Sequence, residues 1–264
     1  MGCLCLFFDA ERRFSAADID ILIMLGRAIA IEEDRWDYQE GLRDFIDIAS
    51  HELRHPMTVI KGYTSTLKKY LDRMDRDAAR SMLGDIEGGV DRLERMVYEL
   101  LDAARLERGR FSLDMEAVDP GLLAAETLEE ARARWPENDF ALRAPATLPP
   151  VRADEDKLKE VLVILLENAI KYSPQGSPVE VEVKLDAAGG VVLSVLDRGP
   201  GVPEKERERI FERFYQAGET RRRPSHGLGL GLYIARRLVE AHGGKIWYEP
   251  REGGGSIFRL TLKG

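Results

Sequence analysis

Three residues with the spacing of one helical face could bind a nucleotide. Asn168, Lys171 and Tyr172 lie at positions i, i+3 and i+4, which share one side of an α-helix. This side is displaced from the apolar stripe of the same segment. An amide oxygen can bind Mg²⁺, an ammonium group can bind phosphate, and an aromatic ring can stack on a base. The same spacing also fits a solvated helix face, so this group alone leaves both interpretations open.

A second candidate is the sequence D-R-G-P-G of residues 197–201, which follows the apolar segment VVLSVL. That segment predicts a buried strand. The carboxylate of Asp197 at the end of this strand could accept a hydrogen bond from the amino group of adenine. Gly199 and Gly201 would let a ligand approach the backbone closely. A plain turn is the alternative interpretation of this motif.

A third candidate is a glycine-rich loop that precedes an apolar helix. Glycines at a helix N-terminus leave backbone N–H groups free to bind phosphate. The spacing G-x-G-x-G differs from the dinucleotide-binding G-x-G-x-x-G, and the preceding TRRRPSH is a basic loop instead of a strand. The lysine signature of a P-loop is absent as well. The candidate phosphate-binding residues are Gly227, Leu228, Gly229, Leu230 and Gly231.

Together with F-E-R-F-Y at 211–215, these motifs resemble the nucleotide-binding domain of sensor histidine kinases, within the wider GHKL ATPase group. Asn168 matches the N box of that family, residues 197–201 the G1 box, FERFY the F box and the glycine-rich loop the G2 box. The resemblance covers roughly residues 110–264. It implies ATP and Mg²⁺ as cofactors, with Asn168 as the Mg²⁺ ligand and with Arg213 and Phe214 in the ATP site.

The preceding segment, residues 37–108, has the apolar spacing of a helical hairpin. Apolar residues recur at close to 3.5-residue intervals in two runs, separated by the charged turn DRMDRD at 72–77. Two such helices cannot cover their own apolar stripe. Two hairpins related by a two-fold axis would close a four-helix bundle. The pattern therefore predicts a homodimer through the helical bundle.

One helix of this hairpin carries a candidate phosphoacceptor. The sequence FIDIASHELRHPM at 45–57 resembles the H box of the same kinases. The resemblance implies that His51 is the phosphoacceptor, that Glu52 is the general base, and that the phosphoryl group passes to the receiver domain of a response regulator. His51 lies two residues from Ala49 and from Leu53, so we expect it to project away from the helical seam.

The same residues also match a zinc-binding pattern. His51, Glu52 and His55 form H-E-x-x-H, which in metallopeptidases provides two zinc ligands and a base. Pro56 follows at once, no third ligand is evident, and a zinc site would leave the nucleotide motifs unexplained. The context of the motif therefore argues against the peptidase, which we keep only as an alternative.

Three positions depart from the kinase pattern. Ile164 stands where many relatives have a second asparagine, and Gln216 where they often have an arginine. These departures motivate another alternative, an ATP-binding dimeric scaffold with weak kinase activity. His55 stands where relatives with phosphatase activity usually have Thr or Asn, which predicts weak phosphatase activity.

Composition excludes several other classes of protein. The 264 residues contain 39 Lys+Arg and 47 Asp+Glu, and a net charge of -8 argues against nucleic-acid binding. The two cysteines exclude a disulfide framework. The longest apolar stretch, 19–31, is interrupted by charges and is too short to cross a bilayer, so we expect no transmembrane segment in this chain and a cytoplasmic location.

The sequence thus predicts four parts. Residues 1–36 resemble the tail of a GAF sensor domain followed by a signalling helix, because G-x-L-x-L precedes F-S-x-x-D and an apolar helix. Residues 37–108 form the dimerisation and histidine phosphotransfer domain, 109–119 a linker, and 120–264 the catalytic ATP-binding domain. The expected fold is an all-α helical hairpin, dimerising into a four-helix bundle, followed by an α+β ATP-binding sandwich of the GHKL (Bergerat) type.

Overall fold

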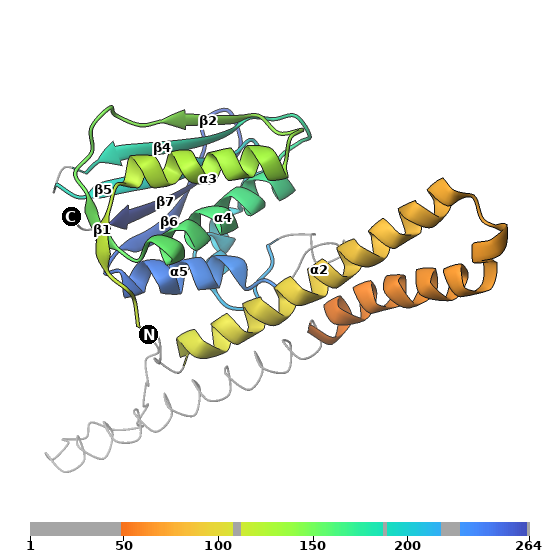
Figure 1. The fold of residues 1–264 in the computed structure, drawn as a ribbon. Helices are drawn as coiled ribbons and strands as arrows, with labels where there is room; N and C mark the ends of the chain where they lie inside the picture. Colours follow the sequence, from red (N-terminus) through yellow and green to blue (C-terminus); the bar gives the residue numbers. More distant parts are fainter. Residues whose placement is uncertain (1–48, 108–111, 187–188, 218–227, 263–264) are drawn as a thin grey trace, which may run out of the picture. The chain divides into compact units, whose positions relative to one another are not determined.

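The computed structural model describes residues 49–107, 112–186, 189–217 and 228–262 (Figure 1). The GAF-like tail and signalling helix expected at 1–36 lie outside the described residues, as do Gly227 and the basic run Arg221–Arg223. Among the described residues, no helix combines the length and the apolar character that crossing a lipid bilayer requires.

The helical hairpin contains a first helix, residues 49–70, the short 3₁₀ helix η1 (Leu71–Arg73) and the long helix α2 (Arg76–Glu107). The two helices approach closely at Gly89 of α2, where a Cβ atom would lie 2.9 Å from Cγ1 of Ile60. Several large apolar side chains of the hairpin remain exposed, as the sequence predicts for a hairpin that cannot cover its own stripe. They include Met57, Leu83, Val90, Val97, Tyr98 and Leu101.

The second domain is built around a mixed five-stranded sheet. The strand order is β2-β4-β5-β7-β6, in which β2 runs parallel to β4 and the other neighbours are antiparallel. A separate pair of short strands, β1 and β3, is antiparallel. The strands are β1 (Glu116–Val118), β2 (Phe140–Arg143), β3 (Val151–Ala153), β4 (Val179–Leu185), β5 (Val191–Leu196), β6 (Lys245–Pro250) and β7 (Ser256–Leu262).

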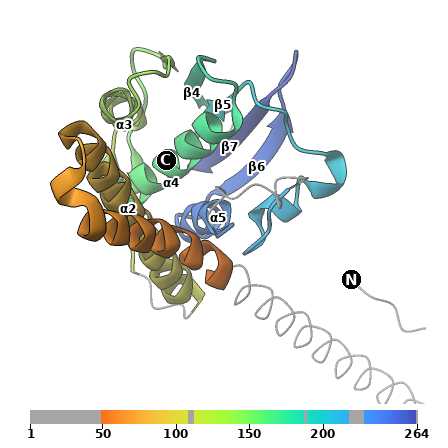
Figure 2. The ribbon, with the colours of Figure 1, turned by 90° about the vertical axis from the view of Figure 1, so that its right-hand side faces the viewer.

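Three helices cover one face of this sheet, α3 (Pro120–Arg134), α4 (Glu155–Tyr172) and α5 (Gly231–Ala241), as Figure 2 shows. Two 3₁₀ turns, η2 (Glu204–Glu206) and η3 (Arg209–Phe211), lie between β5 and α5 in the chain. The core lies between the helices and the sheet. Its fully buried members include Leu128, Leu162, Leu165, Ala235, Val181, Val183, Leu193, Val195 and Leu260.

Aspartates begin two of these helices. The side chain of Asp119 accepts hydrogen bonds from the backbone N–H groups of Gly121 and Leu122 at the start of α3, where Pro120 occupies the first turn. Asp154 accepts the N–H of Lys157 at the start of α4. The Asp154 N–H itself donates to Nε2 of His242, at 3.0 Å. His242 ends α5, so it ties the end of α5 to the start of α4.

The predicted fold class, a helical hairpin followed by an α+β sandwich, is confirmed. One boundary differs from the expectation. Residues 116–118, which the sequence assigned to a linker over 109–119, form β1 and pair with β3 of the second domain. A three-residue strand is too short to show the two-residue alternation by which strands are recognised in a sequence.

Candidate functional site

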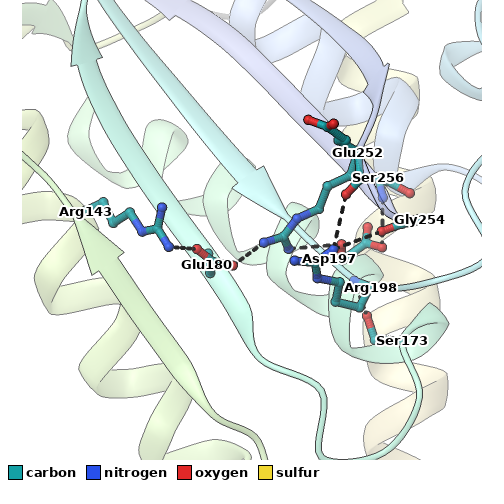
Figure 3. Close-up of polar contacts among 9 residues, drawn as sticks. Arg143, Ser173, Glu180, Asp197, Arg198, Glu252, Gly254 and Ser256 are labelled. Atoms are coloured by element: carbon teal, nitrogen blue, oxygen red, sulfur yellow. Dashed lines mark hydrogen bonds and ion pairs between the residues drawn. The ribbon is translucent and has the colours of Figure 1, made fainter.

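Asp197 follows directly after β5, and its carboxylate is held by the backbone (Figure 3). Its Oδ1 accepts the N–H of Ser256 at 3.1 Å. The same Oδ1 also accepts the N–H of Gly199, at 2.7 Å. The Asp197 N–H donates in turn to the carbonyl of Ser256, at 2.9 Å, which extends the ladder between β5 and β7 by one pair. These bonds fix the orientation of a side chain that is only 2% exposed.

Burial raises the pKa of the Asp197 carboxyl above its ordinary value, because a charged group loses solvation there. The hydrogen bonds from Gly199 and Ser256 and the charge of Arg251 act in the opposite direction. The result is a carboxyl group with a fixed orientation in a low-solvent environment. Such a group can accept a hydrogen bond from an amino group of a base with high selectivity, because an unpaired partner is costly there.

The glycines after Asp197 permit close backbone approaches. A Cβ atom on Gly199 would lie 2.9 Å from the carbonyl oxygen of Tyr172, so this loop packs against the end of α4. Gly201 has φ +74°. The next residue, Val202, donates its N–H to the hydroxyl of Tyr248 at 3.0 Å. The sequence did not predict a role for Tyr248 of β6 at this site. A buried tyrosine needs a partner for its hydroxyl, and here that partner is the loop after Asp197.

The helix α4 presents the predicted nucleotide-binding face. Leu165, Leu166 and Ala169 point into the core, whereas Lys171 and Tyr172 are exposed and Asn168 is partly exposed. The Nζ of Lys171 lies 5.0 Å from the centroid of the Tyr172 ring. The sequence expectation that this face is displaced from the apolar stripe therefore agrees with the structure.

The residues of the candidate site fit a magnesium ion that takes few of its ligands from the protein. Among the described residues, no group of three or more His, Cys, Asp or Glu side chains could hold a metal. Asn168 offers one amide oxygen on an accessible face. Mg²⁺ commonly takes one or two protein ligands and completes its shell with phosphate oxygens and water. The same finding gives no support to a zinc site at His51 and His55.

Ile164, at the position of the second asparagine in relatives, packs against the first residue of α5. A Cβ atom on Gly231 would lie 3.2 Å from Cγ2 of Ile164. Glu167 lies elsewhere, with its Oε1 3.1 Å from Nη2 of Arg134 on α3. Glu167 therefore does not replace the missing polar group at position 164.

The described part of the glycine-rich loop is bound to the FERFY segment. The N–H of Phe214 donates to the carbonyl of Gly229 at 3.0 Å. Both residues have a left-handed backbone conformation, with φ +63° at Phe214 and +69° at Gly229. A non-glycine residue in this region is strained and needs such support. Arg213 and Phe214, both expected in the ATP site, are partly exposed.

The side chains of Leu228 and Leu230 are each 1% exposed and belong to the core. These two residues were expected to bind ATP, and only their backbone groups remain for that role. Leu230 immediately precedes α5 and provides no side-chain cap. Gly227 lies outside the described residues, so this loop is described only from residue 228 onward.

The two residues of the predicted phosphotransfer pair, His51 and Glu52, differ in burial. The His51 side chain is exposed, as the seam geometry predicted, and His55 is exposed as well. Glu52 is 7% exposed, and its Oε2 accepts a hydrogen bond from Nη2 of Arg92 on α2 at 3.0 Å. Arg92 was not singled out in the sequence, because nothing local relates residues on different helices.

The fold and this site define an ATP-binding domain of the histidine kinase type joined to a helical phosphoacceptor hairpin. Two family models match: "Histidine kinase-, DNA gyrase B-, and HSP90-like ATPase" over residues 153–264, and "His Kinase A (phospho-acceptor) domain" over residues 42–109. The chain belongs to the sensor histidine kinases.

Known proteins agree with this membership. The adaptive-response sensory kinase SasA of a Synechococcus species is 34% identical over 92% of this chain and 65% of its own length. The mycobacterial sensor histidine kinase MprB is 30% identical, with a TM-score of 0.50 over 57% of this chain and 97% of that structure. Histidine kinase ThkA, solved with the response regulator TrrA, is 28% identical, with a TM-score of 0.66 over 89% of this chain and 66% of that one.

Curated relatives are longer than this chain. The chain covers 65% of the SasA sequence and between 24% and 48% of several other sensor kinases.

Proposed function

We propose that this chain transfers the γ-phosphoryl group of ATP to His51 and then to an aspartate of a response regulator receiver domain. The observation that carries the proposal is an exposed histidine on a phosphoacceptor helix, in the same chain as a buried, backbone-held Asp197 in an ATPase fold. An exposed acceptor can be reached by a separate nucleotide domain.

The proposed reaction forms one N–P bond and breaks one P–O bond. The unprotonated ring nitrogen of His51 attacks the γ-phosphorus, and ADP leaves with the bridging oxygen. The proton on the other ring nitrogen passes to a carboxylate, which we propose is Glu52. Arg92 of α2 holds this carboxylate in place through a hydrogen bond to Oε2 of Glu52. Catalysis is mainly placement and charge neutralisation, as in other phosphoryl transfers.

The nucleotide would be held by groups from three segments. We propose that Asp197 accepts a hydrogen bond from the adenine amino group and that Lys171 and Arg213 neutralise phosphate charge. Backbone N–H groups at the start of α5 would bind phosphate oxygens. Magnesium, held by Asn168 and the phosphates, would supply further charge neutralisation.

Two partners follow from the family. The exposed apolar residues of the hairpin, among them Val90 and Val97, support a homodimer through a four-helix bundle. The relative ThkA was solved with the response regulator TrrA, which supports a receiver domain as the second substrate. A cytoplasmic location, expected from the sequence, remains a prediction.

The test is incubation of the purified chain with [γ-³²P]ATP, comparing wild type, His51→Gln and His55→Gln. We expect His51→Gln to abolish labelling while ATP affinity stays within about twofold, because the helix and the nucleotide site are separate parts of the chain. The label should be acid-labile and base-stable, as a phosphoramidate is.

His55→Gln is the matched control, since it removes another exposed histidine one turn along the same helix. It should keep its label. Label that persists in His51→Gln would refute the assignment of the acceptor. A wild type that binds ATP without becoming labelled would instead favour the second candidate, a scaffold with weak kinase activity, which Ile164 and Gln216 motivate.

A further inference from the structure

A charged cluster lies on the sheet beside the Asp197 site, and none of its members belongs to the motifs described above. Glu180 of β4 is its centre (Figure 3). Nη2 of Arg143, on the neighbouring strand β2, lies 2.7 Å from Oε2 of Glu180. Nη2 of Arg251, which follows β6, is hydrogen-bonded to Oε1 of Glu180. Each oxygen of the carboxylate thus has its own guanidinium partner.

The two arginines differ in burial. The side chain of Arg143 is 67% exposed, whereas those of Arg251 and Glu180 are each 10% exposed. An exposed ion pair contributes little to stability, but removal of one member of a buried pair leaves an uncompensated charge. The hydrogen bond from Arg251 lowers the pKa of Glu180, and the charges of both arginines act in the same direction. The Glu180–Arg251 pair is therefore the fixed part of this cluster.

The second terminal nitrogen of the Arg251 guanidinium contacts the candidate adenine site. This nitrogen, Nη1, donates to the backbone carbonyl of Asp197, at 3.2 Å. One planar guanidinium thus connects the carboxylate of β4 with the end of β5, as a lysine ammonium could not do with the same geometry.

The backbone of the turn that Arg251 opens also contacts Asp197. The Arg251 N–H donates to the carbonyl of Gly255 at 3.2 Å, which closes the turn between β6 and β7. The next residue, Ser256, donates its N–H to Oδ1 of Asp197. A displacement of Arg251 would therefore move both the carbonyl of Asp197 and one of the backbone N–H donors that orient its carboxylate.

The geometry points to Arg251 and Glu180 as positioning residues for base recognition. Through Arg251, Glu180 fixes the Asp197 backbone and the Ser256 donor, and so orients the carboxylate to accept a hydrogen bond from the exocyclic amino group of a base. The preferred ligand class is a nucleotide whose base carries that donor, as adenine does, over one with a carbonyl at the same position, as in guanine. This inference rests on the proposed function, because it assumes that Asp197 binds the base.

The test measures binding of ATP and of GTP, each with Mg²⁺, to the full chain by titration calorimetry. The variants are Arg251→Met, Glu180→Gln and Arg251→Lys, with Arg143→Met as the matched control that removes the exposed partner of the same Glu180. We expect Arg251→Met to weaken ATP binding about tenfold, roughly one hydrogen bond to a charged group, and to leave GTP binding within about twofold. Glu180→Gln and Arg251→Lys should have intermediate effects, and Arg143→Met should change neither affinity by more than about twofold.

The ratio of the two affinities separates positioning from general structural damage. The inference is overturned if Arg251→Met and Glu180→Gln leave the ratio of ATP to GTP affinity unchanged, even where both affinities fall together. The kinase proposal would stand in that case. Wild type that binds no nucleotide would refute the proposed function and this inference with it. If Arg251→Met does not fold, as judged by thermal unfolding, Glu180→Gln and Arg251→Lys decide the same question.

Discussion

Replacement of Gly255 by alanine should damage the Asp197 site without touching any side chain in it. An ideal Cβ atom on Gly255 would lie 2.1 Å from the carbonyl oxygen of Asp197 and 2.9 Å from its carbonyl carbon. Carbon and carbonyl oxygen atoms normally approach no closer than about 3.3 Å. The turn or the Asp197 backbone must therefore move by roughly 1 Å.

The neighbouring Gly254 provides a matched control. Both glycines have positive φ, +96° at Gly254 and +115° at Gly255, so an alanine at either position has backbone strain of about 1–3 kcal/mol. A Cβ atom on Gly254 would have nothing within 4 Å. The difference between the two variants therefore isolates the steric contact with Asp197.

The magnitudes follow from the contacts that would be lost. Overpacking at Gly255 should lower the free energy of unfolding by about 1–3 kcal/mol more than Gly254→Ala does. The Ser256 N–H to Asp197 Oδ1 distance of 3.1 Å has little room to lengthen. A misdirected Asp197 would lose a hydrogen bond worth about 1.5–3 kcal/mol, which weakens ATP binding roughly 10- to 100-fold.

The assays are urea unfolding and titration of the full chain with Mg·ATP for wild type, Gly254→Ala and Gly255→Ala. Equal stability and equal ATP affinity in the two variants would show that the turn does not press on Asp197, and the reasoning would fail. Loss of stability with unchanged ATP affinity would show that Asp197 does not bind the base.

Three further predictions concern single side chains. Burial raises the pKa of Asp197 above its ordinary 3.8, so the ionised carboxylate destabilises the fold at neutral pH. Asp197→Asn should therefore raise the free energy of unfolding at pH 7 while it weakens ATP binding. Thermal unfolding measured across pH should show this gain in stability disappearing as the pH falls towards 3.8. His55→Thr should increase a weak phosphatase activity, measured as dephosphorylation of the cognate phosphorylated response regulator with ADP present; fast wild-type dephosphorylation that His55→Ala leaves unchanged would contradict this. His242→Ala should lower the free energy of unfolding by about 1–3 kcal/mol in urea, because it leaves the Asp154 N–H without its acceptor; an unchanged midpoint and slope would show that water replaces the imidazole.

Periodicity in the sequence was sufficient for the features that depend on one element. The exposure of His51 follows from its place two residues from seam positions on either side, since a residue turns by 100° along an α-helix. The placement of Lys171 and Tyr172 away from the core follows from the same rule. Asp197 could be placed at a strand end because an uninterrupted apolar segment precedes it and a glycine-rich turn follows.

Other features had no local signal. The strand β1 is only three residues long, and it is a strand because β3 provides its hydrogen-bond partners. Leu228 and Leu230 lie in a glycine-rich motif, yet their side chains fill the core because the loop packs on the FERFY segment. The burial of Leu228 and Leu230 therefore depends on other segments of the chain that pack over them.

The sequence by itself determined the order of the two domains, the helix face that carries His51, and the motifs of the candidate nucleotide site. Only the tertiary structure decided what supports those motifs. Glu180 and Arg251 are 71 residues apart, and Glu52 and Arg92 are 40 apart. Side-chain periodicity extends over a few residues, whereas strand order and helix pairing bring distant residues into contact. The orientation of Asp197 therefore depends on a register between β4, β5 and β7 that no single segment encodes.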